Sequence, residues 1–188
     1  MFLINDLITL LAANLILTQA LGTSTIFIAA ASKKNLVGIA SVVTIFTTSG
    51  SAAVYFINRI TGEKYNDFAL LFYVLAVGII YVLMLFLFRF IGKKSFERTR
   101  KYIHISAYNC AVMGTLFTVS ERFSSGTSAL TDYIKMGFEA GIGFIIAAFI
   151  LTAAYRTLNS AKVPASFRGF PAMLVYLGII SMAVYALK

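Results

Sequence analysis

The chain has 188 residues, of which 60% are hydrophobic and only 12% are charged, and its mean hydropathy is +0.87. Soluble domains carry about 45–50% apolar and about 25% charged residues, so a soluble globular protein is excluded and a single membrane domain is predicted. The net charge of +9 does not indicate nucleic-acid binding. The basic residues lie in short loops between apolar runs, where cytoplasmic retention of Lys and Arg explains them.

Six apolar runs predict an all-α integral membrane protein with six transmembrane helices. A helix needs about 20 residues to cross a bilayer, and each run is adequate for this. The first run is longer than the hydrocarbon core requires, so we expect a break at Leu21–Thr25, where a glycine and three hydroxyl residues weaken the helix. A second break is expected at Ser106–Cys110, the polar centre of the fourth run. The runs are Phe2–Ala31, Leu36–Ile57, Phe68–Phe90, Tyr102–Val119, Leu130–Tyr155 and Phe170–Leu187.

The loops and the breaks predict how these helices are arranged. Two, six and three of the 16 basic residues follow the first, third and fifth runs, so the positive-inside rule places both chain termini on the outer face of the membrane. The halves, about residues 1–95 and 96–188, each hold three runs with a polar break in the first. We therefore expect two inverted repeats within one domain, with the broken helices 1 and 4 marking a functional site near the membrane midplane.

Cys110 is the only cysteine of the chain and lies near the middle of the fourth run. Two interpretations are open: a small buried hydrophobic residue, or a ligand to a metal ion or an iron–sulfur cluster. A cluster normally takes four thiolates, so a cluster at Cys110 would have to be shared with another subunit. The chain contains no phosphate-binding loop, HExxH motif or dinucleotide fingerprint, and no catalytic residue is predicted.

Hydroxyl residues at the first expected break are a second group of candidates. Thr23, Ser24 and Thr25 either cap the backbone where the helix opens, or line a cation path or approach a cofactor beside Cys110. Asn109, which precedes that cysteine, is a further candidate for such a cation path. Irregular backbone at membrane depth is tolerated only against protein or water, so a break there is expected to be covered.

Glu139 is the carboxylate of greatest interest, because ionisable groups inside a membrane span are costly and are functional candidates by default. It lies about nine residues into the fifth run. Either it pairs with Lys135, one helical turn earlier, at the outer interface, or it binds a cation. Gly137, Gly141 and Gly143 predict close helix packing around it.

Four segments of the chain resemble signatures of the RnfA and NqrE family of membrane proteins. Asn109–Gly114 is similar to the NCA(V/I)xG signature, and Val163–Gly169 to the VPxxxRG loop before the last helix. Gly137–Phe144 is similar to the GFGxxxGF stretch, and Leu21–Gly22 with Ser32–Lys34 to the LGxCxxxxxSKK region. The similarity runs in order through essentially the whole chain, and RnfA is the nearer match.

The resemblance implies a membrane subunit of a ferredoxin:NAD⁺ oxidoreductase of the Rnf type, a redox-driven pump of Na⁺ or H⁺. It implies a multi-pass protein of the cytoplasmic membrane of a bacterium or archaeon, which belongs to a translocating enzyme but is not catalytic alone. RnfA-like and RnfE-like subunits form an inverted pair, and each supplies two cysteines from its half-helices to a shared [2Fe–2S] cluster. Flavin- and ferredoxin-type subunits are implied as further partners, with flavins on those subunits.

The chain departs from the family pattern at one cysteine. Ser24 stands where the family has the cysteine of LGxC, so only Cys110 is carried over as an iron ligand. An oxygen ligand is harder than a thiolate, so a cluster would need Ser24 as an alkoxide or three thiolates from a partner. Two alternatives stay open: a cluster-free structural paralogue, and, from a different class, the substrate-binding membrane subunit of a vitamin or small-solute importer.

Overall fold

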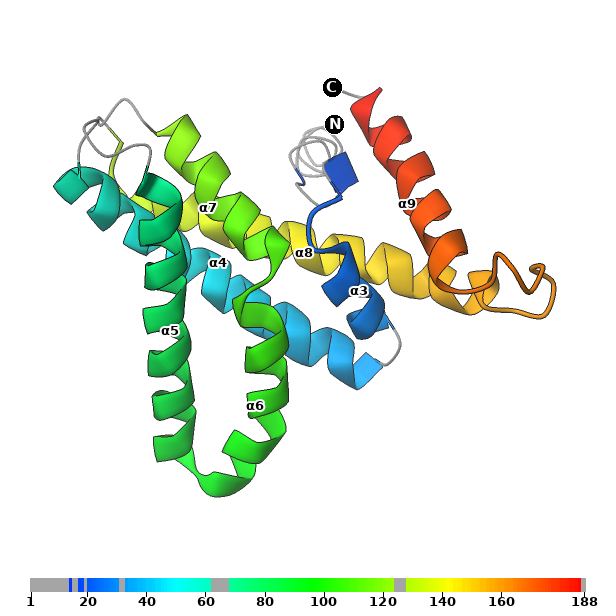
Figure 1. Cartoon of the computed structure of the whole chain (residues 1–188), viewed down its shortest axis with the longest axis horizontal. Helices are drawn as coiled ribbons and strands as arrows, with labels where there is room; N and C mark the ends of the chain where they lie inside the picture. The colour runs from blue at the N-terminus through cyan, green and yellow to red at the C-terminus, as the bar shows by residue number, and fades with distance from the viewer. Residues whose placement is uncertain are drawn as a thin grey trace, which may run out of the picture.

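The described structure is built from helices joined by short turns. The computed structural model describes residues 14, 17, 18, 20–30, 33–61, 68–123 and 128–186. Within these residues there are seven helices and no strand, which confirms the predicted all-α class (Figure 1). The helices are α3 (Thr23–Ala30), α4 (Lys33–Thr61), α5 (Ala69–Ile91), α6 (Lys93–Ala107), α7 (Cys110–Arg122), α8 (Leu130–Leu158) and α9 (Phe170–Tyr185).

Three of these helices are long and apolar enough to cross a membrane. They are α4 over Asn35–Thr61, α5 over Ala69–Phe90 and α8 over Leu130–Tyr155, which correspond to the second, third and fifth predicted runs. Helix α9 is apolar but shorter, at 16 residues. The chain is thus a multi-pass membrane protein. Most of the first run lies outside the described residues, and the number of six spans stays a prediction.

The backbone is irregular at both predicted breaks, while their depth in the membrane stays a prediction. The chain turns at Ala20 and Gly22, where φ is +55° and +76°, and α3 begins at the next residue, Thr23. Glycine adopts this left-handed backbone without the steric cost that a side chain brings. The second break falls between Ala107, the last residue of α6, and Cys110, the first residue of α7. Each break is followed by the start of a new helix. Helix α3 begins at Thr23 and α7 at Cys110, and the sequence analysis singled out both residues.

The extent of the fourth run is corrected by the structure. The sequence predicts one span, Tyr102–Val119, whereas the structure has two helices that together extend from Lys93 to Arg122. The prediction begins too late because it treats the basic segment Lys93–Lys101 as a loop. Lys, Arg and Glu are good helix formers, and they continue the helix before the apolar part begins.

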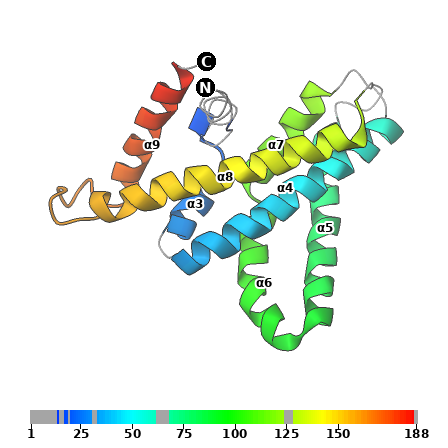
Figure 2. The same cartoon turned by 180° about the vertical axis from the view of Figure 1, so that it is seen from behind.

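Helix α4 is the centre of the packing, since it contacts α3, α5, α6, α7 and α8. It lies side by side with α8, and the two run antiparallel (Figures 1 and 2). Glycines let their backbones approach closely. A Cβ built on Gly141 would lie 2.8 Å from the Cα of Thr44, and one on Gly137 would lie 2.6 Å from the carbonyl oxygen of Thr47. The close packing predicted for these two glycines is confirmed.

Helix α5 contributes little to the core. Only 17% of its apolar window is buried, against 50% for α4, and its exposed side chains are bulky Leu, Ile, Val and Phe residues. Interfaces between membrane helices are enriched in small residues that allow close approach. The exposed face of α5 therefore suits lipid acyl chains better than a tightly packed helix.

A closed polar cluster joins α4, α5 and α7. The Tyr73 hydroxyl donates to Asn58 Oδ1 at 3.0 Å, and Asn58 Nδ2 donates to Ser120 Oγ at 3.2 Å. The Tyr73 and Ser120 hydroxyls are also hydrogen-bonded to each other. Because each polar group satisfies another, the cluster fixes three helices without leaving a buried donor unpaired.

The glycine contact between α4 and α8 predicts that leucine substitutions at two glycines will differ in their effect on stability. Gly141→Leu should lower the free energy of unfolding by about 3 kcal/mol or more, because its Cβ would overlap the backbone of Thr44. Gly178→Leu is the matched control, since no atom lies within 4 Å of a Cβ built there. Thermal unfolding of the detergent-solubilised variants measures the difference. Equal melting temperatures for both variants would contradict the packing.

Candidate functional site

The two helix breaks are in direct contact with each other. A Cβ built on Gly22 would lie 2.7 Å from the Cβ of Ala111 and 2.9 Å from Oδ1 of Asn109. Both distances are shorter than real Cβ contacts, so only a glycine allows the first break to approach the second this closely. The side chain of Leu21 likewise occupies the space that a side chain at position 114 would need, which explains Gly114. The missing side chains of Gly22 and Gly114 therefore let the turn before α3 approach the start of α7 closely.

Asn109 determines where α7 begins. Its backbone is extended, with φ −94° and ψ 136°, and its Oδ1 accepts a hydrogen bond from the Ala111 N–H at 3.0 Å. Asparagine is among the best N-cap residues, because its side chain satisfies one of the unpaired N–H groups of the first turn. The residue is 3% exposed, and its Nδ2 has no hydrogen-bond partner among the residues that the structure describes. The cap makes Cys110 the first residue of a helix.

Ser24 and Cys110 occupy equivalent places at the two breaks. Ser24 is the second residue of α3, Cys110 is the first residue of α7, and both are exposed. Their neighbours Thr25 and Ala111 are buried. The structure therefore does not support the interpretation of Cys110 as a buried packing residue. A hydroxyl and a thiol are presented outward at two helix N-termini, where the helix dipoles favour negative charge.

The remaining predicted site residues do not all lie together. Thr23 is partly buried at the start of α3, and Thr25 and Asn109 are buried beside the contact between the breaks. Glu139 is exposed on α8, as is Lys135. Glu139 has neither an ion pair nor a hydrogen bond within the described part of the chain. Of the two interpretations of Glu139, the ion pair with Lys135 is therefore not seen among the described residues.

Asn14 is a buried polar residue that the sequence analysis missed. Asn14 lies outside every motif, yet its Nδ2 donates to the Gly143 carbonyl of α8 at 2.7 Å and its Oδ1 accepts from the Leu17 N–H at 3.4 Å. It thereby fixes the chain just before the first break to the middle of α8. An asparagine inside the first apolar run was the available signal, because a polar side chain there needs a partner.

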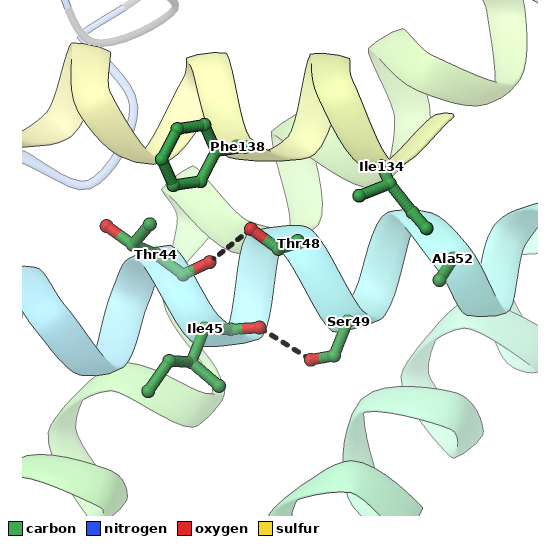
Figure 3. Close-up of a pocket in the computed structure, with 7 residues that line it drawn as sticks. All are labelled: Thr44, Ile45, Thr48, Ser49, Ala52, Ile134 and Phe138. Atoms are coloured by element: carbon green, nitrogen blue, oxygen red, sulfur yellow. Dashed lines mark hydrogen bonds between the residues drawn. The ribbon is translucent and has the colours of Figure 1, made fainter. Parts of the chain in front are cut away.

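A shallow hollow of about 410 Å³ lies between α4 and α8, and Figure 3 shows its walls. Its hydroxyl groups point back to their own helix: Thr48 Oγ1 donates to the Thr44 carbonyl at 2.7 Å, and Ser49 Oγ donates to the Ile45 carbonyl at 2.6 Å. With these donors satisfied, the hollow offers an apolar wall and no hydrogen bond to a ligand. It is lined by Thr44, Ile45, Thr48, Ser49, Ala52, Ile134 and Phe138.

The chain does not hold a metal centre of its own in the part that the structure describes. No group of three or more His, Cys, Asp or Glu side chains that could bind a metal ion is found there. Cys110 is one thiol, and Ser24 is one hydroxyl at the neighbouring helix start. Within the described residues, these two side chains are too few to hold a metal ion by themselves.

The exposure of Cys110 predicts its reactivity. In the detergent-solubilised chain, N-ethylmaleimide should alkylate Cys110, because the thiol is accessible and no other cysteine competes. The control is the double variant Cys110→Ala with Val112→Cys. Its single thiol lies two residues later in the same helical turn, at a position that is fully buried. Mass spectrometry of the labelled chains should show much slower labelling of the control. Equal labelling rates would place Cys110 inside the bundle.

Comparison with known proteins identifies the family of the chain. The family model described as "Rnf-Nqr subunit, membrane protein" matches residues 5–188. The A component of the ion-translocating oxidoreductase complex of Rhodobacter capsulatus is 25% identical over 185 residues, 97% of this chain and 93% of that protein. The same component of the complex of Aromatoleum aromaticum is 31% identical over 88 residues, 46% of this chain and 43% of that protein.

A second kind of relative is similar over part of the chain. The E component of the Na⁺-translocating NADH-quinone reductase of a Psychrobacter species is 27% identical over 108 residues, 57% of this chain and 51% of that protein. These relatives are subunits of ion-translocating oxidoreductase complexes. Since the family model covers nearly every residue, the chain belongs to the Rnf-Nqr family of membrane subunits.

Proposed function

We propose that the chain is one membrane subunit of a redox-driven, ion-translocating complex of the Rnf type. The observation that carries this proposal is the contact between two interrupted helices, which leaves Cys110 and Ser24 exposed at adjoining helix N-termini. Broken helices in membrane proteins carry binding sites, because their free backbone groups must be satisfied by protein, water or a bound group. The family match supports an oxidoreductase complex over a solute importer.

Cys110 would serve as one ligand to the iron of a [2Fe–2S] cluster shared with a homologous, RnfE-like partner. The donor set supports a shared cluster and not one held by this chain alone, because four ligands are needed and the chain has a single thiol. Ser24 would supply an oxygen ligand, or the partner a third thiolate. When bound, such a cluster supplies one-electron transfer between the two sides of the membrane. Helix N-termini favour the negative charge of the ligated thiolate.

The other subunits would carry the first and last redox steps. Ferredoxin- and flavin-type partners would deliver and receive the electrons, and this chain alone would have no catalytic activity. Electron flow would be coupled to movement of Na⁺ or H⁺, with Thr23, Thr25 and Asn109 nearest to the helix breaks. Glu139 would join this path only through a partner, because it is exposed on α8. We place the complex in a bacterial or archaeal cytoplasmic membrane, with both chain termini outside.

Ser24 favours one second candidate, a cluster-free paralogue that keeps the scaffold. A hydroxyl is a poor substitute for a thiolate toward iron, since it is harder and resists deprotonation. A chain of this kind would copurify with the redox subunits and hold their interface without transferring electrons itself. The iron content and electron paramagnetic resonance spectrum of the complex separate the two candidates.

The test is iron content and electron paramagnetic resonance of the dithionite-reduced complex, purified anaerobically. The wild type should show a [2Fe–2S] signal at this interface, and Cys110→Ala should lose that signal, because one iron loses its thiolate. Ser24→Cys should keep the signal and raise cluster occupancy, since a soft ligand replaces a hard one. Ser41→Cys, an exposed position on α4, is the control and should leave the spectrum unchanged.

Two outcomes would contradict the shared cluster. An unchanged signal in Cys110→Ala would remove this residue from the site. The lack of such a signal in every anaerobic preparation, with the complex otherwise intact, would establish the cluster-free paralogue.

A further inference from the structure

Basic residues are concentrated in one segment of the chain, around the turn between α5 and α6. Six of the 16 lysines and arginines lie there, against the single acidic residue Glu97. They are Arg89, Lys93, Lys94, Arg98, Arg100 and Lys101. The positive-inside rule explains why such residues gather at one end of a membrane span. It does not explain how they are distributed around a helix.

Helix α6 has a basic face and a buried face. At about 3.6 residues per turn, its five basic positions fall within an arc of about 160°. Arg100, Lys101 and His104 on that side are exposed, whereas Ile103 and Ser106 on the other side are 0% exposed. The Ser106 hydroxyl is so enclosed that it has no hydrogen-bond partner among the described residues. The helix therefore presents its charges away from the bundle.

The basic face lies beside the apolar, exposed part of α5. The Tyr81 hydroxyl and His104 Nδ1 are hydrogen-bonded at 2.7 Å, which fixes the two helices against each other. The apolar span of α5 continues from Tyr81 for about 13 Å to Phe90. Because α5 and α6 form an antiparallel hairpin (Figures 1 and 2), Arg100 lies only about 6 Å from His104 in the same direction. Arg100 is thus level with the apolar span, and Arg89 is exposed on α5 two turns after Tyr81.

The charge of this face is not neutralised within the part of the chain that the structure describes. The Arg100 Nε–H donates to His104 Nε2 at 3.1 Å, and the guanidinium carbon lies 6.0 Å from the centre of the Phe96 ring. Neither Arg100 nor Lys101 forms an ion pair with another described residue. Arginine carries several N–H donors, so most of those of Arg100 stay free. A charged group level with acyl chains is costly unless it reaches the headgroups or binds a counter-charge.

A phospholipid complements both parts of this surface. Its phosphate accepts hydrogen bonds from a guanidinium, and its acyl chains suit the bulky apolar side chains that α5 exposes. The positive charge of the segment attracts an anionic headgroup, whereas the ammonium of a zwitterionic headgroup is repelled. A tightly packed partner helix suits this surface less, because membrane helix interfaces are enriched in small residues.

We propose that the face of the α5–α6 hairpin that carries Arg89, Arg100 and Lys101 binds anionic phospholipids. Their headgroups contact the basic side chains, and their acyl chains cover the adjoining exposed face of α5. The hydrogen bond between Tyr81 and His104 holds α6 in the register that sets the basic side chains level with the lipid. This proposal does not rest on the shared cluster or on ion translocation.

The test is native mass spectrometry of the detergent-solubilised chain, titrated with dioleoyl phosphatidylglycerol or with dioleoyl phosphatidylcholine. The first phosphatidylglycerol should bind at least about tenfold more tightly than phosphatidylcholine, because only its headgroup is anionic. Inorganic phosphate in large excess should not displace it, because phosphate has no acyl chain. Equal affinities for the two lipids, or displacement by inorganic phosphate, would overturn the proposal.

Two double variants remove the same charge at different places. Arg100→Gln with Lys101→Gln should weaken phosphatidylglycerol binding by about fivefold for each charge removed, with a much smaller effect on phosphatidylcholine. Arg122→Gln with Lys135→Gln is the matched control, at exposed positions near the end of α7 and the start of α8, and should keep the selectivity. Both should melt like the wild type, because the substituted side chains are exposed. Retained selectivity in the first variant, or equal loss in both, would contradict the assignment.

The purified complex distinguishes a lipid from a partner protein on this face. The preference for phosphatidylglycerol should persist in the complex, because the face borders the bilayer. Its loss on assembly would show that another subunit covers the face, and would overturn the lipid assignment. None of these results depends on the iron content, so the lipid surface and the shared cluster are tested separately.

Discussion

The contact between Gly22 and the start of α7 is the constraint on which the rest of the site depends. Irregular backbone at membrane depth is tolerated only where protein or water covers it. Here Gly22 packs directly against the side chains of Ala111 and Asn109, where a Cβ at position 22 would not fit. The positions of Ser24 and Cys110 follow from this contact, since each lies within two residues of it.

Helix α4 with its antiparallel partner α8 is the frame that holds the two breaks in place. Glycines of α8 bring its backbone against Thr44 and Thr47 of α4, and Asn14 fixes the chain before the first break to the Gly143 carbonyl. Both helices are 29 residues long and occupy the second place in their halves of the chain. This arrangement is compatible with the predicted inverted repeat, which stays a prediction.

The sequence predicted the helix class and both breaks, because a glycine among hydroxyl residues and a polar centre in an apolar run are local signals. It did not predict the first half of α6, where charged residues continue a helix that hydropathy cannot detect. The exposure of Cys110 and the unpaired hydroxyl of Ser106 were also beyond it. Both depend on how distant segments pack, whereas a motif reports only residue type and spacing.

The outward-facing thiol of Cys110 has a consequence for biogenesis. A chain inserted into the membrane before its partner would carry a cysteine open to oxidation to sulfenic and higher acids. For the shared cluster proposed above, pairing of the two proteins would have to precede or accompany delivery of iron and sulfide, because this chain alone has a single thiol. Cells would therefore gain from making both proteins together and from degrading whichever is in excess.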